Sequence, residues 1–108
     1  RSYTERYVHQ SLIFGEYLEN ITLEGRGTID GQGTKFNHLP FRQRPYLIRL
    51  VSCRNVKVRD LTLVNSPMWV QHYLACDDLE ISGIRVLSFK GVNNDGCDVD
   101  RCLDFILK

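Results

Sequence analysis

Residues Cys53–Leu63 read CRNVKVRDLTL, and this pattern recurs along the chain. Two later segments also begin with cysteine: Cys76–Val86 (CDDLEISGIRV) and Cys102–Leu107 (CLDFIL). An earlier copy, Leu18–Gly25 (LENITLEG), has leucine in place of the cysteine. The cysteines are 23 and then 26 residues apart, and the first interval is 35 residues, with an insertion around Thr34 to Arg44. A repeat of this length predicts a solenoid.

Apolar and polar residues alternate within each copy, as in a β-strand with one buried face. Val56 and Val58 alternate with Lys57 and Arg59, and the phase then shifts by one residue, as at a corner between two short strands. No segment keeps a helical spacing over ten residues, and few hairpin dipeptides separate the strands, which disfavours an antiparallel sandwich.

These patterns predict an all-β fold, a right-handed parallel β-helix that is incomplete at its C-terminal end. We expect one partial domain over residues 1–108, with residues 1–17 as a lead-in segment and about four coils over residues 18–108.

Equivalent positions of stacked coils lie ~4.8 Å apart and form rows. One predicted row is polar and lies at a turn: Asn20, Asn55, Asp78 and Asp104. Another contains the thiols of Cys53, Cys76 and Cys102 at the edge of the core. Small buried side chains are the favoured interpretation of this row, although the spacing would also permit disulfides between neighbouring coils.

The composition excludes several classes of protein. With 14 basic and 13 acidic residues, the net charge of +1 indicates neither a nucleic-acid nor a membrane partner. The apolar runs are too short to span a bilayer, and we expect a signal peptide to be absent or already removed. The four cysteines have no zinc-site spacing, so we expect no metal and no cofactor.

A run of carboxylates and amides indicates the chemistry. Residues Asn93–Asp100 read NNDGCDVD and contain three carboxylates within six positions. Cleavage of a glycosidic bond needs a pair of carboxylates, one to protonate the leaving oxygen and one to activate water. Asp and Asn also cluster in turns and at calcium sites, so the run alone does not decide between these interpretations.

Counting back from each cysteine aligns two further rows. Four residues back are Arg49, His72 and Asp98, and seven back are Tyr46, Trp69 and Asp95. Strict alternation cannot place both rows on one face, but a bulge at Gly96 would do so. Such a face suits a sugar acid, because aromatic rings offer a flat apolar surface, cations bind carboxylates and aspartates transfer protons.

Each candidate also has a structural interpretation. Trp69 could fill a corner of the core, His72 could be a hydrogen-bonded wall residue, and Arg49 could simply pair with Asp98.

At these residues the chain resembles the polygalacturonases of glycoside hydrolase family 28. Its Asn93-Asn94-Asp95-Gly96 is similar to the family's Asn-Thr-Asp-Gly motif, with Asn94 in place of threonine. Three upstream stretches also resemble family landmarks in the family's order: Gly27–Gly33, Arg44-Pro45 and Asn65–Trp69.

The resemblance implies an inverting hydrolase of α-1,4 galacturonosyl linkages in pectin, with a polysaccharide partner and a secreted or periplasmic location. It implies that Asp95 is catalytic, as one of the two aspartates that activate water. Asp98, His72, Trp69, Arg49 and Asn93 would contact the substrate. The family's Asp-Asp pair, Gly-His-Gly histidine and Arg-Ile-Lys clamp are expected after Lys108, so we expect these 108 residues alone to be inactive.

Two rival functions are considered. A non-catalytic β-helix could bind polysaccharide or serve as a structural module. A calcium-dependent pectate lyase would need carboxylate ligands, for which Asp98 and Asp100 are the candidates. We also expect the isolated chain to self-associate through the open end of its β-helix.

Overall fold

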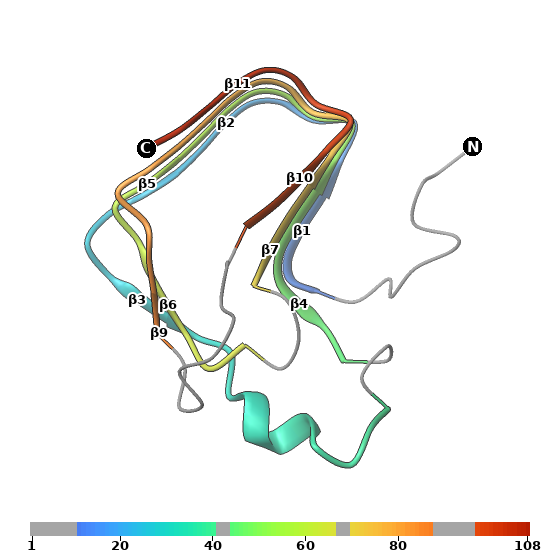
Figure 1. The fold of residues 1–108 in the computed structure, drawn as a ribbon, viewed down its shortest axis with the longest axis vertical. Helices are drawn as coiled ribbons and strands as arrows, with labels where there is room; N and C mark the ends of the chain where they lie inside the picture. Colours follow the sequence, from blue (N-terminus) through green and yellow to red (C-terminus); the bar gives the residue numbers. More distant parts are fainter. Residues whose placement is uncertain (1–10, 41–43, 67–69, 88–96) are drawn as a thin grey trace.

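The computed structural model describes residues 11–40, 44–66, 70–87 and 97–108, which form a stack of coils built from short strands (Figure 1). The first coil contains β1 (Ser11–Glu16), β2 (Glu19–Glu24) and β3 (Thr28–Asp30), followed by the 3-10 helix η2 (Gly33–Phe36). The second contains β4 (Tyr46–Val51), β5 (Arg54–Arg59) and β6 (Thr62–Val64). The third contains β7 (Gln71–Leu74), β8 (Asp77–Ser82) and β9 (Arg85–Leu87), and the fourth contains β10 (Cys97–Asp100) and β11 (Leu103–Leu107).

Strands of successive coils pair in parallel and build three sheets. The orders are β1-β4-β7-β10, β2-β5-β8-β11 and β3-β6-β9, so each strand lies beside its counterparts in the neighbouring coils. This arrangement confirms the predicted parallel β-helix. The stack also begins earlier than predicted, because Ser11–Glu16, expected in the lead-in segment, forms β1 and pairs with β4.

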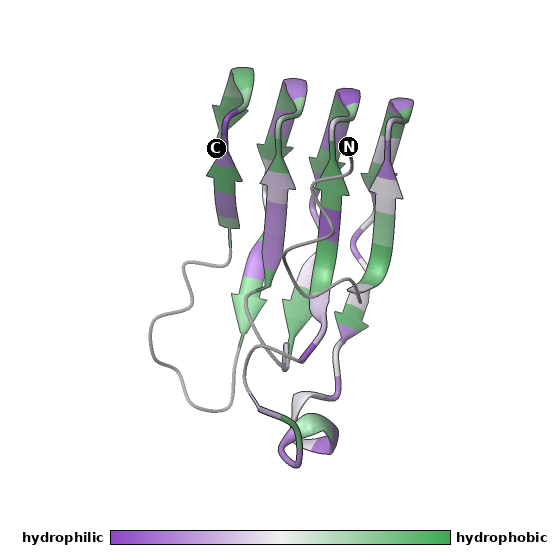
Figure 2. Cartoon of the chain, turned by 90° about the vertical axis from the view of Figure 1, so that its right-hand side faces the viewer, coloured by the Kyte–Doolittle hydropathy of each residue, from purple (hydrophilic) through white to green (hydrophobic). Residues whose placement is uncertain are grey.

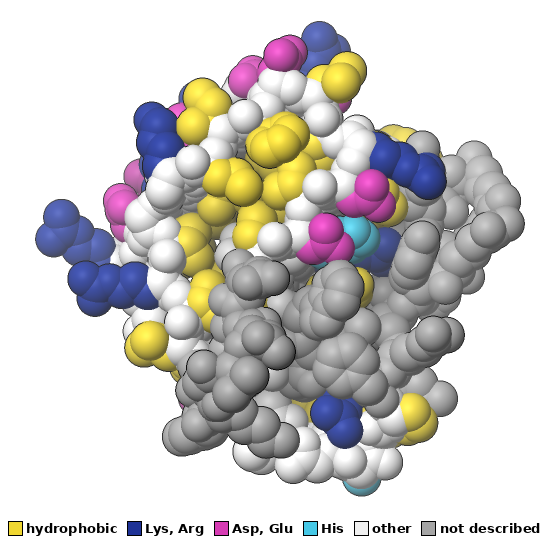
Figure 3. All heavy atoms as spheres, in the orientation of Figure 1, with side chains coloured by type: hydrophobic (Ala, Val, Ile, Leu, Met, Phe, Trp, Pro, Cys, Tyr) yellow, Lys and Arg dark blue, Asp and Glu magenta, His cyan; other side chains and the backbone are white. Residues whose placement is uncertain are grey.

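The core is made of apolar rows that run along the inside of the coils. Three of these rows are Ile21, Val56, Leu79 and Phe105; Leu23, Val58, Ile81 and Leu107; and Ile29, Leu63 and Val86. Val56, Val58 and Leu63 in the second coil are fully buried. Figure 2 shows hydrophobic and hydrophilic residues mixed along the stacked strands. Figure 3 looks onto the end of the stack that β10 and β11 form, and it shows hydrophobic side chains gathered inside the coil. Full burial of one such side chain contributes about 1.5–3 kcal/mol, so these rows stabilise the stack.

The predicted polar turn row is confirmed by the backbone. Asn20, Asn55, Asp78 and Asp104 have φ values of 59°, 54°, 55° and 54°. Asn55 Nδ2 also donates a hydrogen bond of 2.7 Å to Asn20 Oδ1 in the coil before it. Asn and Asp tolerate this left-handed conformation better than most residues, which explains why these residue types recur at the turn.

We expect Asn55→Ala to lower the free energy of unfolding by about 1–2 kcal/mol, because alanine is strained at positive φ. The change also removes the hydrogen bond to Asn20. Asn55→Gly is the matched control, since glycine loses the same hydrogen bond but adopts positive φ without strain. Urea unfolding should rank the alanine variant below the glycine variant, and the reverse order would contradict the strain argument.

The thiol row has the predicted position and consists of free thiols. All four cysteines of the chain lie in the described part and are free. The Sγ atoms of Cys53, Cys76 and Cys102 lie 3.5 Å from Val51 O, 3.5 Å from Leu50 O and 3.3 Å from Tyr73 O, respectively. The hydrogen bond with Cys102, together with burial, raises the pKa of the Cys76 thiol. These contacts favour the interpretation as small core side chains.

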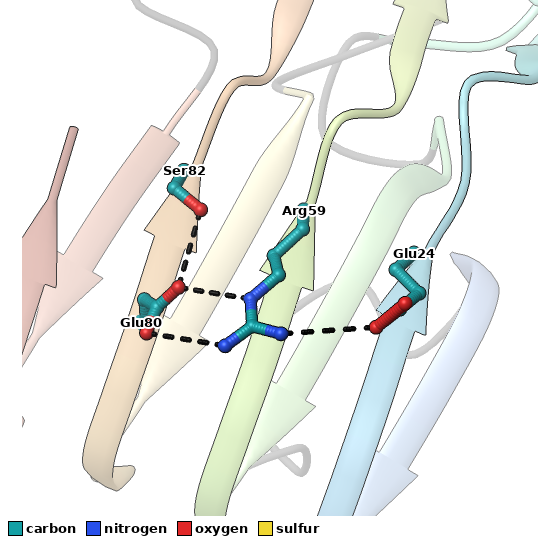
Figure 4. A network of polar contacts seen from close by, with 4 residues as sticks. All are labelled: Glu24, Arg59, Glu80 and Ser82. Atoms are coloured by element: carbon teal, nitrogen blue, oxygen red, sulfur yellow. Dashed lines mark hydrogen bonds and ion pairs between the residues drawn. The ribbon is translucent and has the colours of Figure 1, made fainter.

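Opposite charges alternate between coils on the outer face of the second sheet. Arg59 of β5 lies between Glu24 of β2 and Glu80 of β8, and Ser82 donates to Glu80 (Figure 4). The Arg59 Nε to Glu80 Oε2 distance is 2.9 Å, and the Arg59 Nη1 to Glu24 Oε1 distance is 3.8 Å. The hydrogen bond from Arg59 lowers the pKa of Glu80. Ion pairs of this kind at the surface contribute little stability, so we expect the network to add little to the free energy of unfolding.

None of the described residues forms a helix with the length and apolar character needed to cross a membrane.

Candidate functional site

Three polar residues from consecutive coils form a column on the first sheet. Arg49 of β4 pairs in register with His72 of β7, and His72 pairs with Asp98 of β10. Phe14 of β1 occupies the same position one coil earlier. The register confirms the alignment predicted by counting back from the cysteines. We call Arg49, His72 and Asp98 the polar column.

The polar column runs from the interior to the surface. Arg49 is 0% exposed and His72 is 5% exposed, whereas the Asp98 side chain is 41% exposed. Arg49 Nε donates a hydrogen bond of 3.0 Å to His72 Nδ1, and His72 Nε2 lies 4.0 Å from Asp98 Oδ2. His72 therefore lies between the cation and the carboxylate. In place of a direct pairing of Arg49 with Asp98, which the sequence allowed as a structural alternative, the structure has this three-residue arrangement.

Tyr46 covers the column with its ring. Its centroid is 5.3 Å from that of His72, with an angle of 22° between the ring planes. Arg49 Cζ lies 5.6 Å from the centroid of the same tyrosine ring. The cation over the ring face and the stacked imidazole both restrain the positions of these side chains. Counting back from the cysteines placed Tyr46 in a different row from His72, so this stacking was not predicted.

A bulge in β4 explains how Tyr46 reaches this face. The backbone N–H groups of Leu47 and Ile48 both donate to Val70 O, at 3.2 Å and 3.0 Å. Two residues of β4 therefore oppose one residue of the next coil, which is the pattern of a β-bulge. The bulge lets Tyr46 and Arg49, three residues apart, share one face. The sequence predicted a bulge of this kind at Gly96, which lies outside the described residues. The β4 bulge contains no glycine that would have indicated it.

His72 is held in its neutral form. Burial is the main cause that lowers the pKa of His72 from its ordinary value of 6.5, and the charge of Arg49 adds to it. The carboxylates of Asp98 and Asp100 act in the opposite direction with smaller effects. An imidazole in this environment is a hydrogen-bonding group rather than a cation at neutral pH.

The remaining predicted site residues, Asp95, Asn93 and Trp69, lie outside the described residues. Of the described candidates, Asp98 and His72 come together as predicted. The structure differs in exposure: Arg49 and His72 were both expected on the outer surface, but they are 0% and 5% exposed. The imidazole of His72 accepts a hydrogen bond from the buried guanidinium of Arg49, and the Tyr46 ring lies against it.

The described residues contain no group of three or more His, Cys, Asp or Glu side chains that could hold a metal ion. The register places His72 beside Asp98 and Leu74 beside Asp100. A hydrocarbon side chain therefore lies next to Asp100, where a calcium site shared between coils would need an oxygen ligand.

The fold and the polar column define a solenoid protein with a polar site on one sheet of a parallel β-helix. The chain belongs to glycosyl hydrolases family 28, whose family model matches residues 2–107. It is 38% identical over 101 residues to a "Probable polygalacturonase" of Vitis vinifera, covering 87% of this chain and 21% of that protein. It is 31% identical over 94 residues to a "Polygalacturonase" of Juniperus ashei, covering 76% of this chain and 18% of that protein.

A solved structure supports the fold. The crystal structure of a candidate glycosyl hydrolase from Parabacteroides merdae superposes with a TM-score of 0.73 and 19% identity. The match covers 95% of this chain and 53% of that chain. By contrast, the chain spans only about a fifth of the length of the two plant polygalacturonases named above.

Proposed function

We propose that the parent protein hydrolyses α-1,4 galacturonosyl linkages in pectin, with inversion, as a polygalacturonase. Family membership and the names of the similar plant proteins support this proposal. The observation that carries it is the polar column, which ends in the partly exposed carboxylate of Asp98, three residues after Asp95 in the sequence. A glycosidase needs a pair of carboxyl groups that can reach the sugar, and the column holds one such carboxylate on a strand.

The proposed roles follow from the chemistry of each side chain. Asp95 would act as one of the water-activating carboxylates, and Asp98 would contact the sugar being cleaved. Trp69 would offer a flat apolar surface to a sugar ring, and Asn93 would hydrogen-bond to substrate. In an inverting enzyme the two carboxyl groups are ~6.5–9.5 Å apart, so a second carboxylate must face Asp95 across the bound water.

His72 and Arg49 have a different place in this proposal. Both side chains are almost fully buried, and Arg49 donates a hydrogen bond to His72. We therefore assign them the role of holding Asp98 in place rather than of contacting the polysaccharide directly.

Analysis of the products made by the full-length protein tests the proposed reaction. Hydrolysis of polygalacturonate should release new reducing ends without an unsaturated uronate. Formation of an unsaturated product that depends on calcium would support the lyase, and binding without any product would support the non-catalytic module. Either result would overturn the proposal. The proposed partner is a cell-wall polysaccharide, which is consistent with the proposed secreted or periplasmic location.

The 108-residue chain alone is expected to release no measurable reducing ends from polygalacturonate. The physical reason is that it supplies only the Asp95 side of the carboxylate arrangement. The full-length protein, assayed under the same conditions, is the control. Measurable turnover by the isolated chain would contradict the expectation. The isolated chain should also self-associate through β11, whose apolar side chains Leu103, Phe105, Ile106 and Leu107 are exposed.

A further inference from the structure

The hydrogen bond between Arg49 and His72 determines which imidazole nitrogen carries the proton. A guanidinium has donors only, so the Arg49 Nε–H must meet an acceptor. His72 Nδ1 lies 3.0 Å from Arg49 Nε and therefore presents its lone pair. A neutral histidine that accepts at Nδ1 carries its hydrogen at Nε2.

The other ring nitrogen faces the carboxylate. His72 Nε2 is 4.0 Å from Asp98 Oδ2, which is longer than a direct hydrogen bond. One bridging water, or a small movement of the partly exposed Asp98 side chain, would complete the contact. Hydrogen bonds in the active sites of free enzymes are often long and shorten when substrate binds.

The surroundings of the ring oppose both rotation and protonation. Stacking on Tyr46 holds the plane of the imidazole. A proton added at Nδ1 would point at the Arg49 Nε–H and place two donors against each other. Arg49 and burial disfavour the charged ring, whereas Asp98 and Asp100 favour it less strongly.

We propose that His72 is a neutral hydrogen-bond donor, held in the Nε2–H form by Arg49, that orients the Asp98 carboxylate toward the substrate. His72 is thus a positioning residue: it neither transfers a proton nor binds the sugar acid as a cation. The donor state of the ring stands on its own geometry. Its consequence for catalysis rests on the proposed function.

Histidine-selective 15N labelling of the full-length protein tests the donor state without any activity measurement. Two-bond proton–nitrogen correlations distinguish the two tautomers, and loss of one signal set in His72→Gln assigns the resonance. We expect the Nε2–H form, with a pKa shifted downward. The exposed His38 provides an internal reference spectrum. An Nδ1–H form, or a ring that is protonated at neutral pH, would overturn the proposal.

Arg49→Met is the matched perturbation, since methionine fills space but donates no hydrogen bond. It should raise the pKa of His72 and yield a mixture of tautomers, because both the repelling charge and the Nε donor are removed. An unchanged His72 spectrum in this variant would show that Arg49 does not hold the ring, which would also contradict the proposal.

Kinetics test the link to Asp98. His72→Met should lower kcat by on the order of 10²-fold with a smaller effect on KM, because a misplaced group is costly in the transition state. His72→Gln, which keeps a donor, should lose less. Combined with Asp98→Asn, His72→Met should cost little beyond the larger single effect, since both changes break one contact. Fully additive losses, or an acidic limb of the pH profile that disappears with His72, would overturn the proposal.

The two proposals fail differently. If the full-length protein does not hydrolyse galacturonan but His72 shows the Nε2–H form, the proposed function is wrong and the assigned donor state stands. If hydrolysis is observed and the ring titrates as a free imidazole, the proposed function stands and the role of His72 is wrong.

Discussion

Asp95→Asn in the full-length enzyme is expected to lower kcat on polygalacturonate by about 10²–10⁴-fold, the usual contribution of a general base. The amide has nearly the shape of the carboxylate but cannot accept a proton from the attacking water. Substrate binding should therefore change little, and the loss should appear in kcat rather than in KM. Steady-state kinetics and a separate binding measurement check both parts of this expectation.

Asp78→Asn is the matched control, because it makes the same chemical change at an exposed turn position. Asparagine already occupies the equivalent position of the previous coil as Asn55, with the same left-handed backbone. This variant should retain its activity. A near-normal rate in Asp95→Asn would remove Asp95 from the proposed mechanism, and an equal loss in both variants would point to a general effect on folding.

The second large effect is expected in the core. Leu79→Ala should lower the free energy of unfolding by about 2–5 kcal/mol, the range for truncation of a buried leucine. Leu79 is 1% exposed and packs in the row between Val56 and Phe105. Because each coil contacts only its neighbours, a cavity in the third coil weakens the stacking on both sides.

Leu87→Ala is the control for this prediction, since Leu87 is 58% exposed on β9 in the same coil. It should change the free energy of unfolding by less than about 0.5 kcal/mol. Urea unfolding of both variants gives the comparison. Equal destabilisation by the two changes would contradict the assignment of Leu79 to a continuous buried row.

Much of the fold could be predicted because it depends on local periodicity. Alternation at Val56 and Val58 identified a strand, and the recurring cysteines identified the repeat. The structure places Cys53, Cys76 and Cys102 at equivalent positions, as the register of the flanking strands requires. The start of β1 was missed, because Ser11–Glu16 has no cysteine and its pairing becomes visible only beside β4.

The site was predicted less completely. Counting back from the cysteines aligned Arg49, His72 and Asp98, and the register confirms that alignment. The burial of Arg49 and its hydrogen bond to His72 were not predicted, since spacing carries no information about how far a long side chain reaches. The roles of Asp95, Asn93 and Trp69 stay predictions.

By itself, the sequence determined the repeat, the faces of strands such as β5 and β8, and the order of residues along each row, because hydrophobic burial imposes a period of two on a strand with one buried face. Only the tertiary structure decided how the polar column works. The β4 bulge turns Tyr46 onto the face of Arg49, where its ring stacks on His72, and burial together with the charge of Arg49 lowers the pKa of His72. Those effects depend on the 3.0 Å distance from Arg49 Nε to His72 Nδ1 and on the 5.3 Å distance between the Tyr46 and His72 ring centroids, and these contacts exist only after the second and third coils have stacked.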